Sequence, residues 1–97
     1  MEKFNKMVEQ NMETLEQYVP IVDRVHGESH PEFHDVHRLF NQINKKIKET
    51  NLDRVELNEE ISKLRKITSN YTVPSDVCES YEAVYNMMSE LDEAYKN

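Results

Sequence analysis

The fold is decided at residues 25–33, which read Val25-His26-Gly27-Glu28-Ser29-His30-Pro31-Glu32-Phe33. A histidine is followed here by a glycine, the residue that most often ends a helix in the left-handed conformation. Pro31 is favoured in a first helical turn, and Glu32 suits the positive end of a helix. The stretch therefore predicts a corner between two helices, with a left-handed cap at Gly27 and an imidazole at His26 that can face the interior.

Apolar side chains recur at steps of three and four residues along four segments, which is the period of a helix that buries one face. The expected core stripes are Asn5, Val8, Met12, Leu15, Val19, Val22 and His26; Phe33, Val36, Phe40, Ile43 and Ile47; Leu57, Ile61, Leu64 and Ile67; and Val77, Tyr81, Val84, Met88, Leu91 and Tyr95. No strand-like alternation interrupts them. The sequence therefore predicts an all-α fold, an antiparallel up-down four-helix bundle.

Three features are expected to shape the helix ends. Pro20 lies inside the first segment but off its apolar face. It removes one backbone hydrogen bond, so the first helix is expected to kink or break near residues 16–18. The third helix is expected to fray at residues 69–70. Ser75 is expected to cap the fourth helix, with Asp76 in its first turn.

Length and charge limit the classes to which the chain can belong. Its 97 residues are expected to form one bundle domain, 1–97, with a thin core that would gain from association with another chain. The net charge of −7 argues against nucleic acid and anionic lipid as partners. No apolar run reaches the length of a membrane span, the first residues do not read as a signal peptide, and the lone Cys78 offers no disulfide framework. A cytoplasmic protein is expected.

Metal ligands are scarce on the expected core stripes. His26 is the one side chain there of a type that binds iron. The carboxylates of Glu59, Glu60, Asp92 and Glu93 are expected on outward faces. A di-iron site needs several inward histidines and carboxylates from facing helices, so one imidazole is not enough to build it.

The remaining histidines and the cysteine leave alternatives open. His30, His34 and His37 follow an i, i+4, i+7 spacing, which could form a surface zinc or nickel site or simply a solvated face. All four histidines, within residues 26–37, could together sense acidification. Cys78 could be a reactive thiol near the start of a helix or a packed small side chain. The solvated face and the packed side chain are the favoured interpretations, and no catalytic residue is expected.

Two blocks of the chain resemble the RIC family, the hemerythrin-like di-iron proteins that repair iron–sulfur clusters. The first runs from residue 25 to 40 and carries the VHG-x-x-HPE corner followed by Leu39 and Phe40. The second, LRKITSNYTVPSDVCESYEAVYNMMSEL, runs from residue 64 to 91 and resembles the family pattern LR-x-LT-N-Y-x-P-x-x-AC-x-x-x-x-ALY-x-x-L-x-x-L. Together they cover nearly half of the chain, in the order found in the family. The resemblance implies a hemerythrin-like bundle.

The resemblance also implies where the two irons would bind, and most of those positions have changed. The histidine of the VHG corner is kept as His26. The family's other histidines would fall near Asn5, at Thr50, at about Arg54 and, together with a glutamate, just after Asn97. By the same comparison, another family glutamate is expected to fall in a stretch that is deleted here, and no counterpart of the family's N-terminal cysteine-bearing domain is expected. The scaffold is expected to be kept and the metal chemistry lost.

These observations favour a non-enzymatic, metal-free protein-interaction module, accessory to iron–sulfur cluster repair under stress. The expected partner is a protein: a second copy as a homodimer, a full-length RIC relative or an iron–sulfur client. The alternative is an iron or zinc protein whose site combines His26 and His30 with a second chain. A third interpretation is a generic four-helix adaptor.

Overall fold

The computed structural model describes residues 2–51 and 54–96. Within these ranges it contains four helices and no strand. The helices are α1 (Glu2–His26), α2 (Glu32–Glu49), α3 (Asn58–Ile67) and α4 (Glu79–Lys96). The prediction of an all-α fold with four helices is confirmed.

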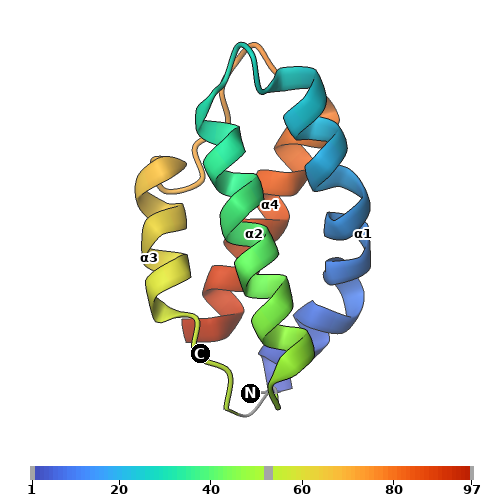
Figure 1. Ribbon diagram of the computed structural model, residues 1–97, viewed down its shortest axis with the longest axis vertical. Helices are drawn as coiled ribbons and strands as arrows, with labels where there is room; N and C mark the ends of the chain where they lie inside the picture. The colour runs from blue at the N-terminus through green and yellow to red at the C-terminus, as the bar shows by residue number, and fades with distance from the viewer. Residues whose placement is uncertain (1, 52–53, 97) are drawn as a thin grey trace.

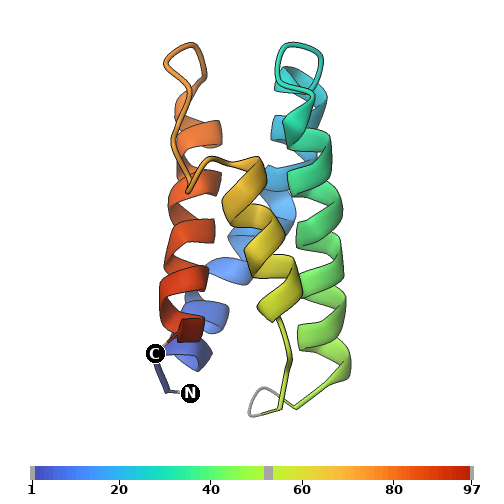
Figure 2. The same ribbon diagram turned by 90° about the vertical axis from the view of Figure 1, so that its left-hand side faces the viewer.

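The helices lie side by side along the long axis of the molecule (Figure 1). The α1–α2 and α3–α4 connections lie at one end, and the α2–α3 connection lies at the other end together with both termini. α1 packs against α2 and α4, and α2 also packs against α3. α2 and α4 therefore occupy opposite sides of the molecule (Figure 2).

The core is made by the apolar faces of all four helices. Its fully buried aromatic side chains are Phe4, Phe33, Phe40, Tyr81 and Tyr85. Most of the expected stripe positions are buried. The start of α1 differs, because Phe4 and Met7 fill the core where Asn5 and Val8 were expected, and those two are half-buried. Burial of the larger apolar side chains of Phe4 and Met7 removes more apolar surface from water than burial of Asn5 and Val8 would.

The corner after α1 differs from the prediction in two ways. α1 continues as one helix through Pro20, so no break occurs near residues 16–18. Gly27 does not have a positive φ, so the left-handed cap is wrong. Its N–H instead continues the helical bonding to the Asp23 carbonyl at 2.8 Å, and a Cβ here would lie 2.5 Å from the His34 ring. A glycine is required at this position for space.

The connection between α3 and α4 is longer than predicted. α4 begins at Glu79, so Ser75 does not cap it and Asp76 is not in its first turn. α3 ends at Ile67, two residues before the expected fraying at residues 69–70, and residues 69–71 adopt three successive left-handed φ values of 51°, 63° and 64°. Such residues cost about 1 kcal/mol or more each. Thr68 offsets part of this cost, since its hydroxyl donates to the Leu64 carbonyl at 2.6 Å and accepts from the Tyr71 N–H at 2.8 Å.

Two carboxylates predicted to face outward are buried. Asp92 is 4% exposed and accepts two hydrogen bonds from Arg65, at 2.6 and 2.7 Å. Glu60 is 7% exposed and forms an ion pair with Lys46 at 2.7 Å. The prediction that the inward stripes of α3 and α4 carry no acid is therefore wrong. Burial is tolerated because each carboxylate has a cation from another part of the chain.

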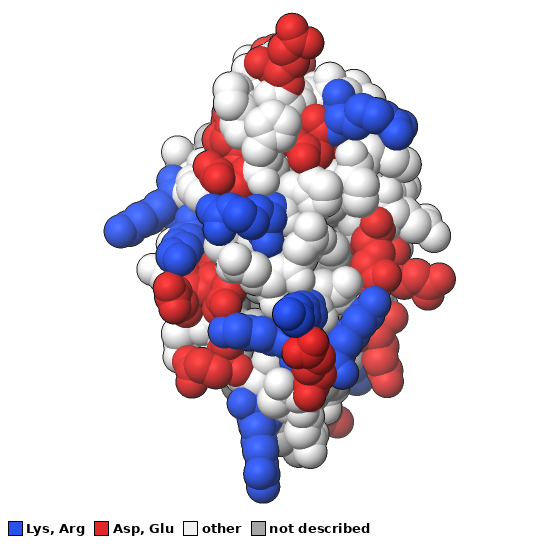
Figure 3. Space-filling model, in the orientation of Figure 1, with Lys and Arg blue, Asp and Glu red and all other residues white. Residues whose placement is uncertain are grey.

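The surface carries charge unevenly. On the face that has α2 at its middle, Lys and Arg side chains gather over the centre, while Asp and Glu side chains lie mainly toward the edges (Figure 3). Across residues 2–51 and 54–96, none of the helices combines the length and apolar character that a bilayer crossing requires.

Candidate functional site

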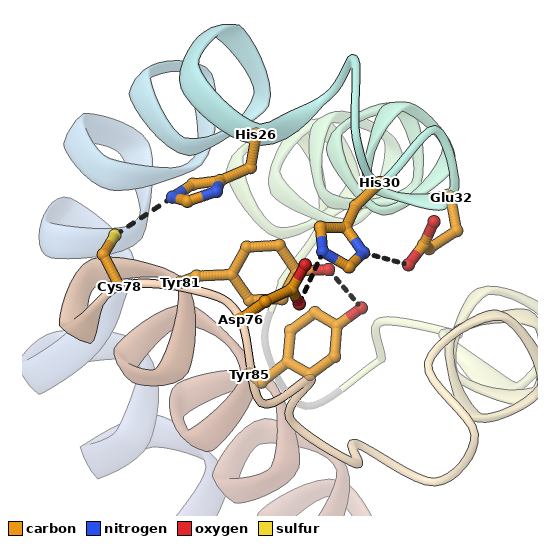
Figure 4. Close-up of polar contacts among 7 residues, drawn as sticks. All are labelled: His26, His30, Glu32, Asp76, Cys78, Tyr81 and Tyr85. Carbon is orange, nitrogen blue, oxygen red and sulfur yellow. Dashed lines mark hydrogen bonds and ion pairs between the residues drawn. The ribbon is translucent and has the colours of Figure 1, made fainter.

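All four histidines of the chain lie at the end of the bundle where α1 meets α2 and α3 leads into α4. Each one contacts a residue from a different element, and together with their partners we call them the histidine corner. Figure 4 shows the part of it around His26 and His30. The helix end, the Gly27 turn and the long connection before α4 bring these groups together.

His26 pairs with Cys78 across the corner. Its Nε2 lies 3.2 Å from the Cys78 Sγ (Figure 4). Either the thiol donates to the ring nitrogen or the ring N–H donates to the sulfur. Cys78 is exposed and directly precedes α4, so the predicted packed side chain in the first helical turn is wrong. It lines a surface pocket of about 320 Å³ beside Val73 and Pro74.

His30 bridges two carboxylates. Its Nδ1 lies 3.1 Å from the Glu32 Oε2, and its Nε2 lies 3.0 Å from the Asp76 Oδ1. A neutral imidazole has one N–H, whereas the imidazolium has two, so this arrangement fits the charged form. Burial on its own would lower the pKa of His30, but the hydrogen bonds and charges of Glu32 and Asp76 together raise it above its ordinary value.

His34 and His37 converge on one carboxylate of α1. The Asp23 Oδ2 lies 2.7 Å from the His37 Nδ1, and its Oδ1 lies 2.5 Å from the His34 Nδ1. The first contact has hydrogen-bond geometry, and the second is close enough for an ion pair without that alignment. The predicted solvated histidine face along α2 is therefore only partly right. His34 is well exposed, but both rings bind Asp23, and His30 precedes the helix.

Two buried tyrosines form the floor of the corner. The Tyr81 ring makes edge contacts with both His26 and His30, at centroid distances of 5.5 and 5.6 Å. Its hydroxyl lies 3.1 Å from that of Tyr85 (Figure 4). Burial raises the pKa of both hydroxyls, and the bond from Tyr85 raises that of Tyr81 further. The sequence identified Tyr81 as core but gave it no role near the histidines.

The donors of the corner do not converge on one point. Among the residues that the structure describes, no three His, Cys, Asp or Glu side chains are grouped so that they could hold a metal ion. His26 and Cys78 offer two donors, and both ring nitrogens of His30 are already engaged. One chain therefore presents at most half of a four-coordinate site here.

The positions implied by the RIC resemblance are scattered. Asn5 lies near the N-terminus of α1, far along the helix from His26, and its buried Oδ1 has no hydrogen bond. Thr50 directly follows α2, and its N–H donates to the Lys46 carbonyl. Arg54 is exposed, and Asn97 lies outside the described residues. These residues show no arrangement around a common centre with His26.

Comparisons with known proteins return no relatives. No family model matches the chain, and neither a curated protein nor a solved structure matches it.

Proposed function

We propose that this chain is a metal-free, non-enzymatic relative of the RIC proteins that acts through protein contacts, as an accessory to iron–sulfur cluster repair under stress. The observation that carries the proposal is how the inward acids are used. In a di-iron bundle such carboxylates bind metal. Here the buried carboxylates of the described ranges, Glu60 and Asp92, bind Lys46 and Arg65 instead.

Asp92 is the clearest example of a buried carboxylate that is bound by a cation of the chain. Arg65 binds both of its oxygens, and the Tyr71 hydroxyl donates to its Oδ2 at 2.8 Å. Arg65 holds the pKa of Asp92 below its ordinary value despite burial, with a further contribution from Tyr71. A metal ion would have to displace a bidentate guanidinium, the strongest kind of hydrogen-bonded partner for a carboxylate.

Action through protein contacts fits the other properties of the chain. Among residues 2–51 and 54–96, the large apolar side chains that are exposed are Ile21 and Val25, at 47% and 63%, one turn apart on α1. The proposal also specifies the fold beyond four helices: a hemerythrin-like antiparallel up-down bundle in which α1 is kinked near Pro20. A crystal structure would test that assignment directly.

The test combines metal analysis with a binding measurement. The chain is purified without added metal, and its iron and zinc contents are measured before and after incubation with ferrous iron and desalting. It is then titrated into a full-length RIC protein by calorimetry. We expect far less than one equivalent of metal and a saturable complex. Stoichiometric iron would refute the metal-free proposal, and absence of heat at all concentrations would refute this choice of partner.

A second candidate is the metal protein completed by a second chain, and one distance favours it. A tetrahedral zinc ion holds a histidine nitrogen and a cysteine sulfur about 3.5 Å apart. His26 and Cys78 lie 3.2 Å apart. Two copies could therefore supply two histidines and two cysteines to one zinc ion around a twofold axis. Cys78 replaces His30 as the expected companion of His26, because His30 is held by Glu32 and Asp76.

Cobalt provides the test of this second candidate. Cobalt bound to thiolates has a charge-transfer absorption that carboxylate or imidazole ligands do not give. Titration of the reduced chain should produce this band and a dimer, and the Cys78→Ser variant should lose both. A flat titration would eliminate the candidate, and a band that survives in Cys78→Ser would show that the site does not use this thiol.

A further inference from the structure

The exposed face of α2 carries a basic ridge, made of His34, Arg38, Asn41, Lys45 and Lys48. At 3.6 residues per turn these side chains fall within about 80° of one another and extend about 21 Å along the helix. All five residues are exposed. The ridge is notable in a chain with a net charge of −7.

The exposed face of α4 carries an acidic ridge of the same form, made of Glu79, Glu82, Asn86, Glu90 and Glu93. These side chains also fall within about 80° and span about 21 Å. All five residues are exposed. Both ridges have two ionisable residues on each side of a central asparagine, Asn41 in α2 and Asn86 in α4.

The two ridges cannot meet within one chain. α2 and α4 form opposite sides of the bundle, so their solvent faces point away from each other (Figure 2). The basic side chains over α2 are visible in the middle of Figure 3. Within the chain, His34 of this ridge lies 2.5 Å from the mostly buried Asp23. The contacts of its Lys and Arg side chains are exposed: Arg38 lies 3.3 Å from Asp35, and Lys48 lies 3.4 Å from Glu16. Exposed pairs of this kind contribute little to stability and exchange readily.

We propose that the basic ridge of α2 docks on the acidic ridge of α4 of a second copy of this chain. The inference rests on the proposed function, action through protein contacts, and names the surface and the partner. Equal length, equal width and opposite charge make the two ridges complementary, with the central asparagines able to hydrogen-bond across the contact. Because the two ridges lie on opposite sides, the contact is head-to-tail and extends into an open chain of copies.

The electrostatics set the expected behaviour. Each copy carries a net charge of −7, so distant copies repel, while the ridges attract at short range. Ion pairs at such a contact are solvent-exposed and screened by salt. Association is therefore expected to be reversible, dependent on protein concentration and weakened by salt.

A charge-swap experiment tests the contact. One variant, Arg38→Glu with Lys45→Glu, gives both ridges a net negative charge, and the other, Glu79→Lys with Glu82→Lys and Glu90→Lys, gives both ridges a net positive charge. Sedimentation velocity is run on each variant, on their equimolar mixture and on the wild type, at low salt and at about 0.5 M salt. We expect the wild-type association constant to fall at least about tenfold in each variant alone and to recover in the mixture.

A matched control separates the ridge from net charge. Lys6→Glu with Lys66→Glu changes the net charge by the same amount as the α2 variant at exposed positions outside the ridges, and it should associate like the wild type. A wild type that stays monomeric at every concentration, or a mixture that stays monomeric, would overturn the proposal. So would a control that loses association as strongly as the α2 variant. These outcomes leave the metal content and the binding to a full-length RIC protein unaffected, so the proposed function fails or stands separately.

Discussion

The replacement Asp92→Ala is the most informative single perturbation of this bundle. The carboxylate is 4% exposed and joins three elements: Arg65 from α3, Tyr71 from the connection after it, and α4 itself. Tyr71 also ends the strained left-handed run at residues 69–71. Removing the carboxylate therefore breaks both the ion pair that links α3 to α4 and the support of that run.

The expected loss can be worked out from the three contacts. Loss of the bidentate acceptor costs about 1–2 kcal/mol after allowance for the partial exposure of Arg65. A half-buried Tyr71 hydroxyl left without its acceptor costs about 1 kcal/mol more. We expect the free energy of unfolding to fall by about 2–3 kcal/mol, a large share of the 5–15 kcal/mol typical of domains. For a chain of this size the melting temperature should fall by about 10–20 °C.

Urea unfolding followed by circular dichroism is the assay, with Glu82→Ala as the control. That variant removes the same charge from an exposed position of α4 and should change stability by less than about 0.5 kcal/mol. The pH dependence gives a second readout. Because the folded pKa of Asp92 is lowered, its contribution is present above the ordinary value of 3.8 and is lost as the pH falls through the folded pKa. The difference between wild type and Asp92→Ala should therefore shrink in strong acid.

Two results would contradict this reasoning. If Asp92→Ala unfolded at the same urea concentration as Glu82→Ala, the network around the carboxylate would not stabilise the fold. If the wild type lost as much stability as the variant when treated with a metal chelator, Asp92 would be a metal ligand rather than a partner of Arg65.

Three further predictions concern the histidine corner. His30→Gln should lower the free energy of unfolding by about 0.5–1 kcal/mol near pH 5.5 and by less as the pH rises. The pKa of His30 is raised in the folded protein, so its bridge to the two carboxylates is fully formed below the unfolded pKa and is lost as the pH rises through the folded pKa. An equal loss of stability at pH 8 in urea titrations would refute this. Gly27→Ala should destabilise by about 1–3 kcal/mol in the same assay, since its Cβ would press on the backbone of Asp23 and on the ring of His34; a neutral effect would mean that the turn relaxes freely. Tyr85→Phe should lower the free energy of unfolding by about 1 kcal/mol, because it leaves the Tyr81 hydroxyl without the hydroxyl that lies 3.1 Å from it. Thermal unfolding measures the effect, and an unchanged melting temperature would show that this hydrogen bond does not stabilise the fold.

The helices themselves were largely predictable, because they are set by local periodicity. The spacing of Phe33, Val36, Phe40 and Ile43 gave the buried face of α2, and Pro31 marked its start. The start of α4 was not predictable in this way. By its place after Ser75, Asp76 is expected in the first turn of the helix. Its carboxylate instead binds His30, 46 positions earlier in the sequence, and the helix begins three residues after Asp76.

The burial of Glu60 and Asp92 differs from the outward positions expected from the sequence. A charged residue is expected outside unless a partner is known, and the partners of Glu60 and Asp92 are 14 and 27 positions away in sequence. One signal was available. Glu60 follows Leu57 by three residues and precedes Leu64 by four, the spacing of the core stripe itself. Likewise the pairing of His26 with Cys78 joins residues 52 positions apart, which no local pattern reveals.

The central proposal is that this chain holds no pair of iron atoms, since the buried acids of the described residues, Glu60 and Asp92, are bound to its own cations. Iron content measured on protein purified without added metal, and again after loading with ferrous iron and desalting, tests it most directly. We expect far less than one iron per chain in both samples. Close to two irons per chain, with an oxo-bridge absorption, would contradict it.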